Sequence, residues 1–400
     1  MSTADFEFGE VLGEGAYGAV VRATEKATGR TMAVKMIQKK HLDKEQKRQY
    51  AKTERDILSM CDHPLIIKLY TTFQDPAFLY YAMELAPNGE LHGLVRKLGG
   101  LSLESAAFYT AEIILALEYL HTVKGVMHRD LKPENVLLSE TGHIKLTDFG
   151  TSKVVGVARD ARSNSFVGTA EYIGPELLQG DNKVAYKSMD LWSLGCMVFQ
   201  MICGRPPFRG ATEYVTFQKV SAGKVIFPTN MPDLAKDLIK RLCVVDPFAR
   251  LGADNFAELK AHPFFAGINW NTIMESTPIQ QSYPDKIIWE EDVIKEEEER
   301  QRQVREAERK EWASFLLDTE KILVSGLIYK RRKLSIKKRF MILTDTPRLI
   351  YIDPKARELK GEVPWSRKLT VEVKNDVTWR VNTPKRIYFL EDISKNASRW

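Results

Sequence analysis

The chain has 400 residues, of which 44% are hydrophobic and 28% are charged. This length predicts roughly two to three domains, and the composition excludes both a disordered chain and a membrane-embedded protein. The first residues show no basic-then-apolar signal peptide, and the longest apolar stretch, 191–204, is too short to cross a bilayer. The cysteines lack metal-ligand spacing and are expected to be free thiols, as in a cytosolic protein: Cys61, Cys196, Cys203 and Cys243.

The formal net charge of +6 conceals an uneven distribution. Residues 321–400 contain 20 Lys and Arg against 8 Asp and Glu, a balance of +12, whereas the first 320 residues carry a balance of −6. This asymmetry predicts a separate C-terminal module that faces an anionic partner.

The elements expected along the first two thirds of the chain change from strands to helices. Residues 6–37 alternate short apolar runs with glycines, which predicts antiparallel strands, and residues 41–60 have helical spacing. Helical patterns then dominate from about Leu103 and recur at 192–201, 233–243 and 256–260. We therefore expect a small strand-rich lobe, followed by a larger helical lobe.

The last third changes character again. The mixed-charge run 290–309 predicts a solvated linker helix, and short β-rich runs separated by turns begin at residue 322. The runs predict an all-β sandwich or barrel of about 80 residues. The expected boundaries are 6–266, with a division between lobes at about residue 85 or 86, a charged linker at 267–320, and a C-terminal domain at 321–400.

A glycine-rich segment lies in the first predicted hairpin. Gly13, Gly15, Gly18 and Val20 have the spacing GxGxxGxV, which by itself also suits a dinucleotide-binding turn. The residues that follow continue as a strand and not as a helix, which favours a β-hairpin over a nucleotide. Backbone N–H groups of such a turn can bind phosphates.

Two charged residues extend this arrangement. Lys35 lies in a following strand and would bring a positive charge to the phosphates. Glu54, on the predicted helix 41–60, would hold that ammonium in place.

Two further motifs make the pattern specific. Residues 128–135 read His-Arg-Asp-Leu-Lys-Pro-Glu-Asn, and residues 148–150 read Asp-Phe-Gly. With the glycine-rich segment, they make residues 6–266 resemble a complete eukaryotic protein kinase domain. The resemblance implies that Asn135 and Asp148 bind Mg²⁺ and that Asp130 accepts the proton of the substrate hydroxyl. The resemblance also implies that Lys132 contacts the γ-phosphate and that the kinase is specific for Ser or Thr.

The same resemblance assigns the nucleotide contacts and the structural charges. The carbonyl of Glu84 and the N–H of Ala86 would face the purine, next to the gatekeeper Met83, and Glu90 would contact the ribose. Asp190 would brace the catalytic loop, and Glu176 and Arg250 would form an ion pair of the large lobe.

Within the segment 148–176, Ser165 occupies the position of the activating phosphate in the family. A phosphoserine there would pair with Arg129 and order the segment.

Residues 164–172, together with Asp-Phe-Gly-Thr-Ser-Lys at 148–153, resemble the 3-phosphoinositide-dependent protein kinases of the AGC group. Most AGC kinases carry a Phe-x-x-Phe motif that folds onto their own small lobe, but no such pair follows Phe265 here. The resemblance implies a free groove that accepts the phosphorylated hydrophobic motif of a substrate kinase. It would be lined by Lys39, Leu42, Ala51, Arg55, Thr72, Gln74 and Leu79. A plain solvated helix face is the alternative.

Residues 322–400 resemble a pleckstrin homology (PH) domain whose first hairpin carries clustered bases. The resemblance implies that four cations bind a 3-phosphorylated inositol lipid at the inner face of the plasma membrane: Lys330, Lys337, Arg339 and Arg386. A generic basic patch is the alternative, and nucleic acid is not expected because the hairpin lacks interleaved aromatic residues. The closing helix of this domain is expected to continue beyond Trp400.

The sequence thus predicts an α+β protein, with a bilobal kinase fold followed by a PH-like β-sandwich with a truncated C-terminal helix. It is expected to use ATP and Mg²⁺ to phosphorylate activation segments of other AGC kinases. An AGC kinase with other substrates and an inert lipid-binding scaffold remain as alternatives, and loss of cellular function in Asp148→Ala would exclude the scaffold.

Overall fold

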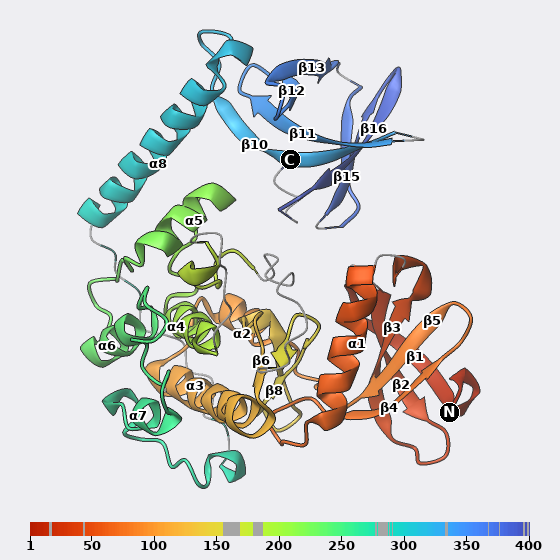
Figure 1. The fold of residues 1–400 in the computed structure, drawn as a ribbon, viewed down its shortest axis with the longest axis vertical. Helices are drawn as coiled ribbons and strands as arrows, with labels where there is room; N and C mark the ends of the chain where they lie inside the picture. The colour runs from red at the N-terminus through yellow and green to blue at the C-terminus, as the bar shows by residue number, and fades with distance from the viewer. Residues whose placement is uncertain are drawn as a thin grey trace. The chain divides into compact units, whose positions relative to one another are not determined.

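The computed structural model describes residues 1–15, 18–42, 45–154, 169–178, 187–276, 278, 287, 289, 291–332, 335–366, 368–375, 377–394, 397 and 400. They form two compact units, Met1–Glu290 and Glu291–Trp400, and each unit is described by itself (Figure 1). Among these residues, no helix combines the length and the apolar character that crossing a membrane requires.

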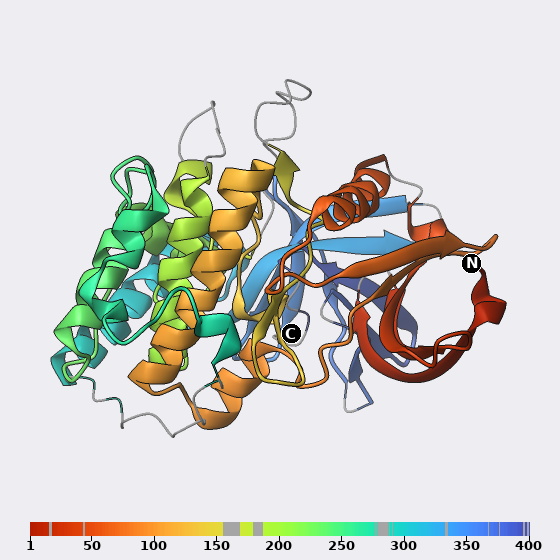
Figure 2. The same ribbon diagram turned by 90° about the horizontal axis from the view of Figure 1, so that it is seen from below.

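The N-terminal lobe of the first unit is an antiparallel sheet with the strand order β1-β2-β3-β5-β4. Its strands are β1 (Phe6–Gly15), β2 (Gly18–Glu25), β3 (Thr31–Gln38), β4 (Leu69–Gln74) and β5 (Phe78–Met83). Figure 2 shows how strongly the first strands curve. The short helix η2 (Lys39–Leu42) and α1 (Glu45–Met60) follow β3 and lie beside the sheet.

Helices dominate the second lobe of this unit, as the sequence predicts. They are α2 (Leu91–Leu98), α3 (Leu103–Glu118), α4 (Ser188–Cys203), α5 (Glu213–Ala222), α6 (Asp233–Leu242) and α7 (Phe256–Lys260). Helix α4 is buried along nearly its whole length because most of its side chains are apolar. Trp192 stacks on Phe208 there, with ring centroids 5.1 Å apart.

Two small two-stranded sheets form the part of this lobe that carries the kinase-like motifs. Strand β6 (Val126–Met127) pairs with β9 (Lys153–Val154), and β7 (Val136–Leu138) pairs with β8 (Ile144–Leu146). The segment 128–135 therefore leaves β6 and enters β7, and the segment 148–150 lies between β8 and β9.

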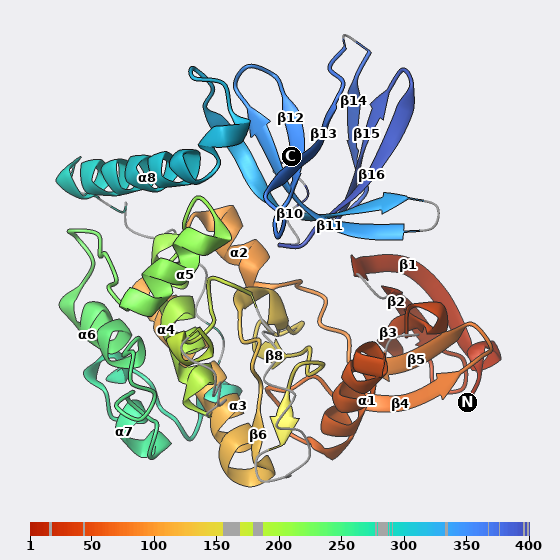
Figure 3. The same ribbon diagram turned by 45° about the horizontal axis from the view of Figure 1, so that its top comes forward.

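The second unit is an antiparallel sheet with the strand order β13-β12-β11-β10-β16-β15-β14 (Figure 3). Its strands are β10 (Ile322–Arg332), β11 (Ser335–Thr344), β12 (Leu349–Asp353), β13 (Glu358–Val363), β14 (Thr370–Val373), β15 (Thr378–Thr383) and β16 (Arg386–Asp392). One face encloses a core that includes Ile328, Met341, Trp379 and Leu390.

Helix α8 (Glu291–Glu311) belongs to this second unit, although the sequence analysis placed its residues in the linker 267–320. Immediately after the helix, the buried Trp312 stacks on Phe340 of β11, with ring centroids 4.4 Å apart. The guanidinium of Arg357 lies over the Trp312 ring, 5.2 Å from its centroid. These contacts fix the C-terminal end of α8 to the sheet.

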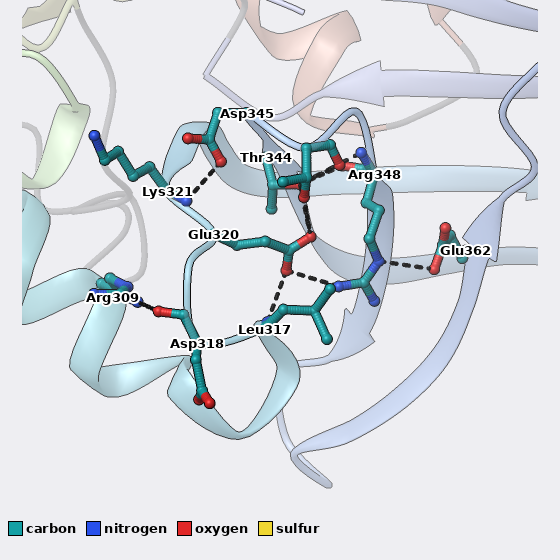
Figure 4. Close-up of polar contacts among 10 residues, drawn as sticks. Arg309, Leu317, Asp318, Glu320, Lys321, Thr344, Asp345, Arg348 and Glu362 are labelled. Atoms are coloured by element: carbon teal, nitrogen blue, oxygen red, sulfur yellow. Dashed lines mark hydrogen bonds and ion pairs between the residues drawn. The ribbon is translucent and has the colours of Figure 1, made fainter.

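Glu320 anchors the segment between α8 and β10 (Figure 4). Its carboxylate is fully buried and accepts hydrogen bonds from Leu317 N (2.8 Å), Thr344 Oγ1 (3.2 Å), Thr346 Oγ1 (2.5 Å) and Arg348 Nη1 (2.7 Å). Burial would raise the pKa of Glu320, but the bonds from Thr346, Leu317 and Arg348 outweigh it and lower that pKa. A charged carboxylate with this many donors is the expected form of a buried acid.

At the other end of the unit, Trp400 stacks on Trp379 with ring centroids 5.4 Å apart and an interplanar angle of 10°. Its indole Nε1 donates to Asp392 Oδ2 at 2.9 Å. Trp400 therefore covers part of the sandwich core at this end.

Candidate functional site

The glycine-rich segment connects β1 to β2. Gly13 lies opposite Val20, and Gly15 lies opposite Gly18; residues 16 and 17 between them lie outside the described part of the chain. A Cβ atom at Gly18 would lie 1.7 Å from the carbonyl oxygen of Met36, so only glycine fits between β2 and β3. A Cβ at Gly13 would have open space around it. The hairpin therefore leaves room above its backbone, where phosphates can approach.

Lys35 and Glu54 meet as the sequence analysis expects. Lys35 Nζ of β3 lies 2.5 Å from Glu54 Oε1 of α1. Burial would lower the pKa of Lys35, but the charges of Glu54 and Asp148 raise it, so that the ammonium stays charged. The ion pair fixes α1 close to the sheet and places a positive charge beside Asp148.

Asp130 and Lys132 form the centre of the loop between β6 and β7. Lys132 Nζ donates to Asp130 Oδ2 and to Thr169 Oγ1, both at 2.9 Å. The backbone N–H of Thr169 donates to Asp130 Oδ1 at 3.2 Å. Burial would lower the pKa of Lys132, but Asp130 outweighs it and raises the pKa. The carboxylate of Asp130 is thereby held in one orientation by groups from two segments.

Asn135 and Asp148 provide oxygen atoms next to this centre. The Asn135 amide nitrogen donates to the Asp130 carbonyl oxygen at 2.7 Å, which fixes the orientation of the amide. Asp148 has a φ of 64°, in the left-handed region that a non-glycine residue rarely adopts. Burial would raise the pKa of Asp148, but Lys35, His128 and Lys132 lower it, so that the carboxylate is charged.

A carboxylate and an amide oxygen are hard donors, which Mg²⁺ prefers, and they are too few to hold it without further oxygen ligands. Phosphate oxygens and water supply such ligands in kinase sites. The two residues therefore fit a magnesium ion that arrives with a nucleotide.

Asp190 of α4 braces the backbone of the same loop. Its carboxylate accepts hydrogen bonds from the N–H groups of His128 and Arg129, both at 2.8 Å, and lies 2.7 Å from His121 Nε2. Arg129 has a φ of 70°, so these bonds hold a strained backbone in place. Burial would raise the pKa of Asp190, but the bonds and charges of His121 and His128 lower it.

Glu176 and Arg250 form a buried, bidentate ion pair, with Arg250 Nη1 and Nη2 each 2.7 Å from a Glu176 oxygen. Arg250 also lies 5.1 Å from the ring centroid of Trp192. The pair joins the end of the 148–176 segment to the core of the large lobe.

The residues expected at the purine lie where β5 ends. The Glu84 N–H donates to the Lys68 carbonyl at 2.8 Å, and the Glu84 carboxylate pairs with Lys145 at 2.6 Å. The Glu84 side chain is thus engaged within the protein. Ala86 packs against the core, and Glu90 precedes α2 as its N-cap residue. Burial and the charge of Glu134 raise the pKa of Glu90.

Arg129 is buried, and its Nε makes no hydrogen bond within the described part of the chain. Burial lowers the pKa of its guanidinium, although Asp190 opposes this effect, and an arginine remains protonated at neutral pH. Ser165, its expected partner when phosphorylated, lies outside the described residues.

The residues of the expected docking groove come from adjacent elements. Leu42 and Ala51 are buried in the core that Leu79 also contacts, and Gln74 lies opposite Leu79 in the β4–β5 pair. Thr72 is on the same strand as Gln74.

The charged members of this set already have partners in the protein. Lys39 Nζ donates to the Asp75 carbonyl at 2.6 Å, and Arg55 donates to Asp56 at 2.6 and 2.9 Å. Arg48 Nε, in addition, donates to the Leu42 carbonyl at 2.8 Å. A phosphate would have to compete with Asp56 for Arg55.

The four cations expected to bind an inositol phosphate share one face of the second unit. Lys330 lies directly opposite Lys337, and Ile328 lies opposite Arg339, in the β10–β11 pair. Directly opposite residues share a face, as do residues two apart on a strand. Lys330 also lies opposite Leu390 on β16, so Arg386, four residues before Leu390, is on this face too.

Two tyrosines hold the buried member of this set. Lys330 Nζ lies 3.2 Å from the ring centroid of Tyr351 and 5.0 Å from that of Tyr388. Arg386 lies 4.9 Å from the Tyr388 ring, and Arg339 pairs with Asp353 at 2.9 Å. Neither tyrosine belongs to the predicted site, although strand alternation places both on the inner face.

Thr169 lies in the segment 164–172 that the resemblance covers, but no role is predicted for it from the sequence. Thr169 lies 37 residues after Lys132 in the sequence, so no local pattern predicts the contact between them.

Comparisons with known proteins agree with this geometry. Residues 6–265 match the protein kinase domain family, and residues 310–400 match the PH domain family. Fold and site together define a serine/threonine protein kinase that carries a C-terminal PH domain, which confirms the predicted fold class and enzyme class. Membership of this family implies the use of ATP and a divalent metal ion.

Among the relatives are the 3-phosphoinositide-dependent protein kinases 1 of Rattus norvegicus and Homo sapiens. Each is 40% identical over 99% of this chain and over 81% and 82% of its own length, respectively. The protein of the same name from Arabidopsis thaliana is 38% identical over 99% of this chain and 89% of its own length. The chain therefore belongs to the family of 3-phosphoinositide-dependent protein kinases, as its sequence motifs indicate.

Proposed function

We propose that this kinase transfers the γ-phosphate of ATP to Ser or Thr residues in the activation segments of other AGC kinases. The arrangement of Asp130, Lys132 and Thr169, in which one carboxylate is oriented for a substrate hydroxyl, supports transfer to Ser or Thr. Membership of the family of 3-phosphoinositide-dependent protein kinases supports the proposed class of substrate. Asp130 accepts the hydroxyl proton, and Lys132 holds the transferred phosphoryl group. Positioning and charge neutralisation, rather than covalent catalysis, supply the acceleration.

The surrounding residues bind the nucleotide. Gly13, Gly15 and Gly18, with Val20, cover the phosphates, and Lys35, held by Glu54, contacts them. The backbone of Glu84 and Ala86 binds the purine, and Glu90 the ribose. Asn135 and Asp148 would hold Mg²⁺. This ion, when bound, would neutralise negative charge on the phosphates.

The regulation we propose rests on Arg129 and on the docking groove. A phosphate on Ser165 would pair with Arg129, whose Nε is buried without a hydrogen bond in the described structure. Substrate kinases would dock by a phosphorylated hydrophobic motif in the groove formed by η2, α1, β4 and β5.

The PH domain supports recruitment to a membrane. We propose that Lys330, Lys337, Arg339 and Arg386 bind the phosphates of a 3-phosphorylated inositol lipid at the inner face of the plasma membrane. Their shared face and the fixed orientation of Lys330 and Arg339 support this assignment.

The test measures transfer of labelled phosphate to the activation segment of an AGC kinase, with and without a phosphorylated Phe-x-x-Phe peptide. We expect the peptide to stimulate transfer and Asp148→Ala to abolish it. Asp62→Ala, which removes an exposed carboxylate in the same unit, is the matched control and should retain activity.

Transfer that is indifferent to the peptide would contradict the docking proposal and leave a kinase with other substrates. Absence of any transfer by the intact protein would favour the inert scaffold.

A further inference from the structure

A side-chain ion pair connects the segment between the two lobes of the first unit to the strand that precedes Asp148. Lys145 Nζ of β8 lies 2.6 Å from Oε1 of Glu84, the first residue after β5. The side chains of Lys145 and Glu84 are only 13% and 24% exposed. Solvent therefore screens this pair less than a pair on the open surface, which contributes little. Lys145 lies outside the motifs from which the candidate site is predicted.

Backbone hydrogen bonds also lead from β8 to this segment, by a different path. The Ile67 N–H donates to the Leu146 carbonyl of β8 at 3.0 Å, and the Glu84 N–H donates to the Lys68 carbonyl at 2.8 Å. Ile67 and Lys68 are adjacent in the sequence, so the two bonds form one continuous path. The Lys145–Glu84 ion pair joins its two ends and closes it into a ring.

The ring restricts the orientation of β8 relative to residues 84–86, which we call the hinge. A single run of backbone bonds permits rotation about its own axis, whereas a side-chain contact to one side of that axis opposes the rotation. Asp148 follows β8 directly, and the N–H of Thr147 donates to the Asn135 carbonyl at 3.0 Å. The orientation of β8 therefore determines where both expected magnesium ligands lie relative to the hinge.

The ion pair belongs to the assembled form of the site. In the same structure Lys35 contacts Glu54 at 2.5 Å, and Lys132 contacts Asp130 at 2.9 Å. A contact that restrained an inactive arrangement would be expected to break when these groups come together. Its coexistence with them favours a role in holding the site in place.

We propose that Lys145 is a positioning residue, which through Glu84 holds the hinge at a fixed place relative to Asn135 and Asp148. The inference rests on the proposed nucleotide site, in which the hinge binds the purine and the other two residues bind Mg²⁺, and it adds how the two ends of that site are kept aligned. A nucleotide that contacts both ends gains affinity from the fixed spacing, because neither end has to move when it binds.

A ligand that contacts the hinge alone should gain nothing from the ion pair. The Glu84 N–H keeps its bond to Lys68 when Lys145 is changed, so the hinge backbone retains its own support. Adenosine lacks phosphates and is such a ligand. The difference between adenosine and a nucleotide bound with Mg²⁺ therefore isolates the alignment from the shape of the hinge.

The experiment measures binding of two probes to the full chain by isothermal titration calorimetry. One probe is adenosine, and the other is Mg²⁺ with adenylyl imidodiphosphate, which spans the whole site and is not hydrolysed. The test variant, Lys145→Met, keeps most of the aliphatic stem and removes the charge. The matched control is Glu118→Gln, since Glu118 pairs with Lys260 at 2.7 Å in the same unit and is also partly exposed.

We expect Lys145→Met to weaken binding of the magnesium–nucleotide complex about tenfold, because a partly buried contact between charged groups is lost. Adenosine should bind this variant as it binds the wild type, which also shows that the variant is folded. Lys145→Arg keeps the cation and should recover most of the affinity for the complex. Glu118→Gln should bind both probes as the wild type does.

Glu84→Gln completes a double-mutant cycle with Lys145→Met. If the two side chains act as a pair, the double variant should bind the magnesium–nucleotide complex no more weakly than either single variant, because each substitution removes the same contact. Losses that multiply in the double variant would show separate roles and would overturn the proposal.

Three further results would overturn it. Lys145→Met might equal the wild type in affinity for the complex, or it might lose affinity equally for both probes, which would show that the hinge itself is disturbed. A higher kcat with unchanged affinity would mean that the pair restrains the lobes. All three leave the proposed function standing, whereas failure of the wild type to bind the complex would overturn the proposed function and this inference together.

Discussion

Thr169 provides a direct test of how the proposed active site is held together. Its hydroxyl accepts a hydrogen bond from Lys132 Nζ at 2.9 Å, and that ammonium also contacts Asp130. Thr169→Val keeps the shape of the side chain and removes the acceptor. The backbone N–H that donates to Asp130 is retained. The substitution removes the contact with the lysine, together with a long hydrogen bond that the hydroxyl donates to Asp130 Oδ1 at 3.5 Å.

The expected magnitude follows from the charge of the donor. A hydrogen bond to a charged group contributes about 1.5–3 kcal/mol. At about 1.4 kcal/mol for each factor of ten in rate, its loss should lower kcat by roughly 10- to 100-fold. The KM for ATP should change little, because the contact of Lys35 with Glu54 and the packing of the glycine-rich hairpin on β3 do not involve Thr169.

Steady-state kinetics with a peptide substrate measure this effect, and thermal unfolding verifies that the variant is folded. Thr169→Ser retains the hydroxyl and should recover most of kcat. An unchanged kcat in Thr169→Val would refute the idea that Thr169 positions Lys132. A rise in KM for ATP with constant kcat would show instead that the contact serves nucleotide binding.

Two further predictions concern stability. Glu320→Gln should destabilise the second unit by about 3 kcal/mol, measured by chemical denaturation, because Arg348 would lose its buried partner. The folded pKa of Glu320 is lowered, so its contribution is complete above about pH 4.3, the ordinary glutamate pKa, and is lost as pH falls through the folded value. Glu320→Gln should therefore flatten the acid limb of the stability curve, and an unchanged limb would contradict this. Gly18→Ala should lower the melting temperature of the first unit without nucleotide, whereas Gly13→Ala should not, and equal effects would show that the Met36 contact relaxes.

The sequence indicates which residues form the candidate catalytic centre because the chemistry of phosphoryl transfer requires particular residue types at short spacings. Asp130, Lys132 and Asn135 lie within six consecutive residues, so their proximity is a local property. Lys35 and Glu54 are 19 residues apart in the sequence. They meet because α1 follows β3 and lies beside the sheet. The kinase and PH families that these motifs indicated are confirmed by the comparisons.

Other features depend on long-range packing that no local pattern contains. The mixed charges of α8 indicated a solvated linker, whereas Trp312, just beyond the helix, packs on Phe340 and fixes its end to the sheet. Glu320 looks like any surface acid in the sequence, and only the convergence of Arg348 and two threonines makes it a buried anchor. Likewise, the exposed Ile336 and Phe389 share one face of the sheet only through the register of β10 with β11 and β16.

The charged groups of the proposed active site show why the protein would accelerate phosphoryl transfer mainly by positioning these groups before the nucleotide binds. The pKa of Lys35 and that of Lys132 are raised by adjacent carboxylates, and the pKa of Asp148 is lowered by the two lysines and His128. All three groups therefore remain charged across the neutral range, and none of them has to change protonation for a nucleotide to bind. The protein has already met the desolvation cost of these charges by pairing them during folding. A phosphate then enters a field that is oriented in advance, which is the electrostatic preorganisation that phosphoryl transfer requires.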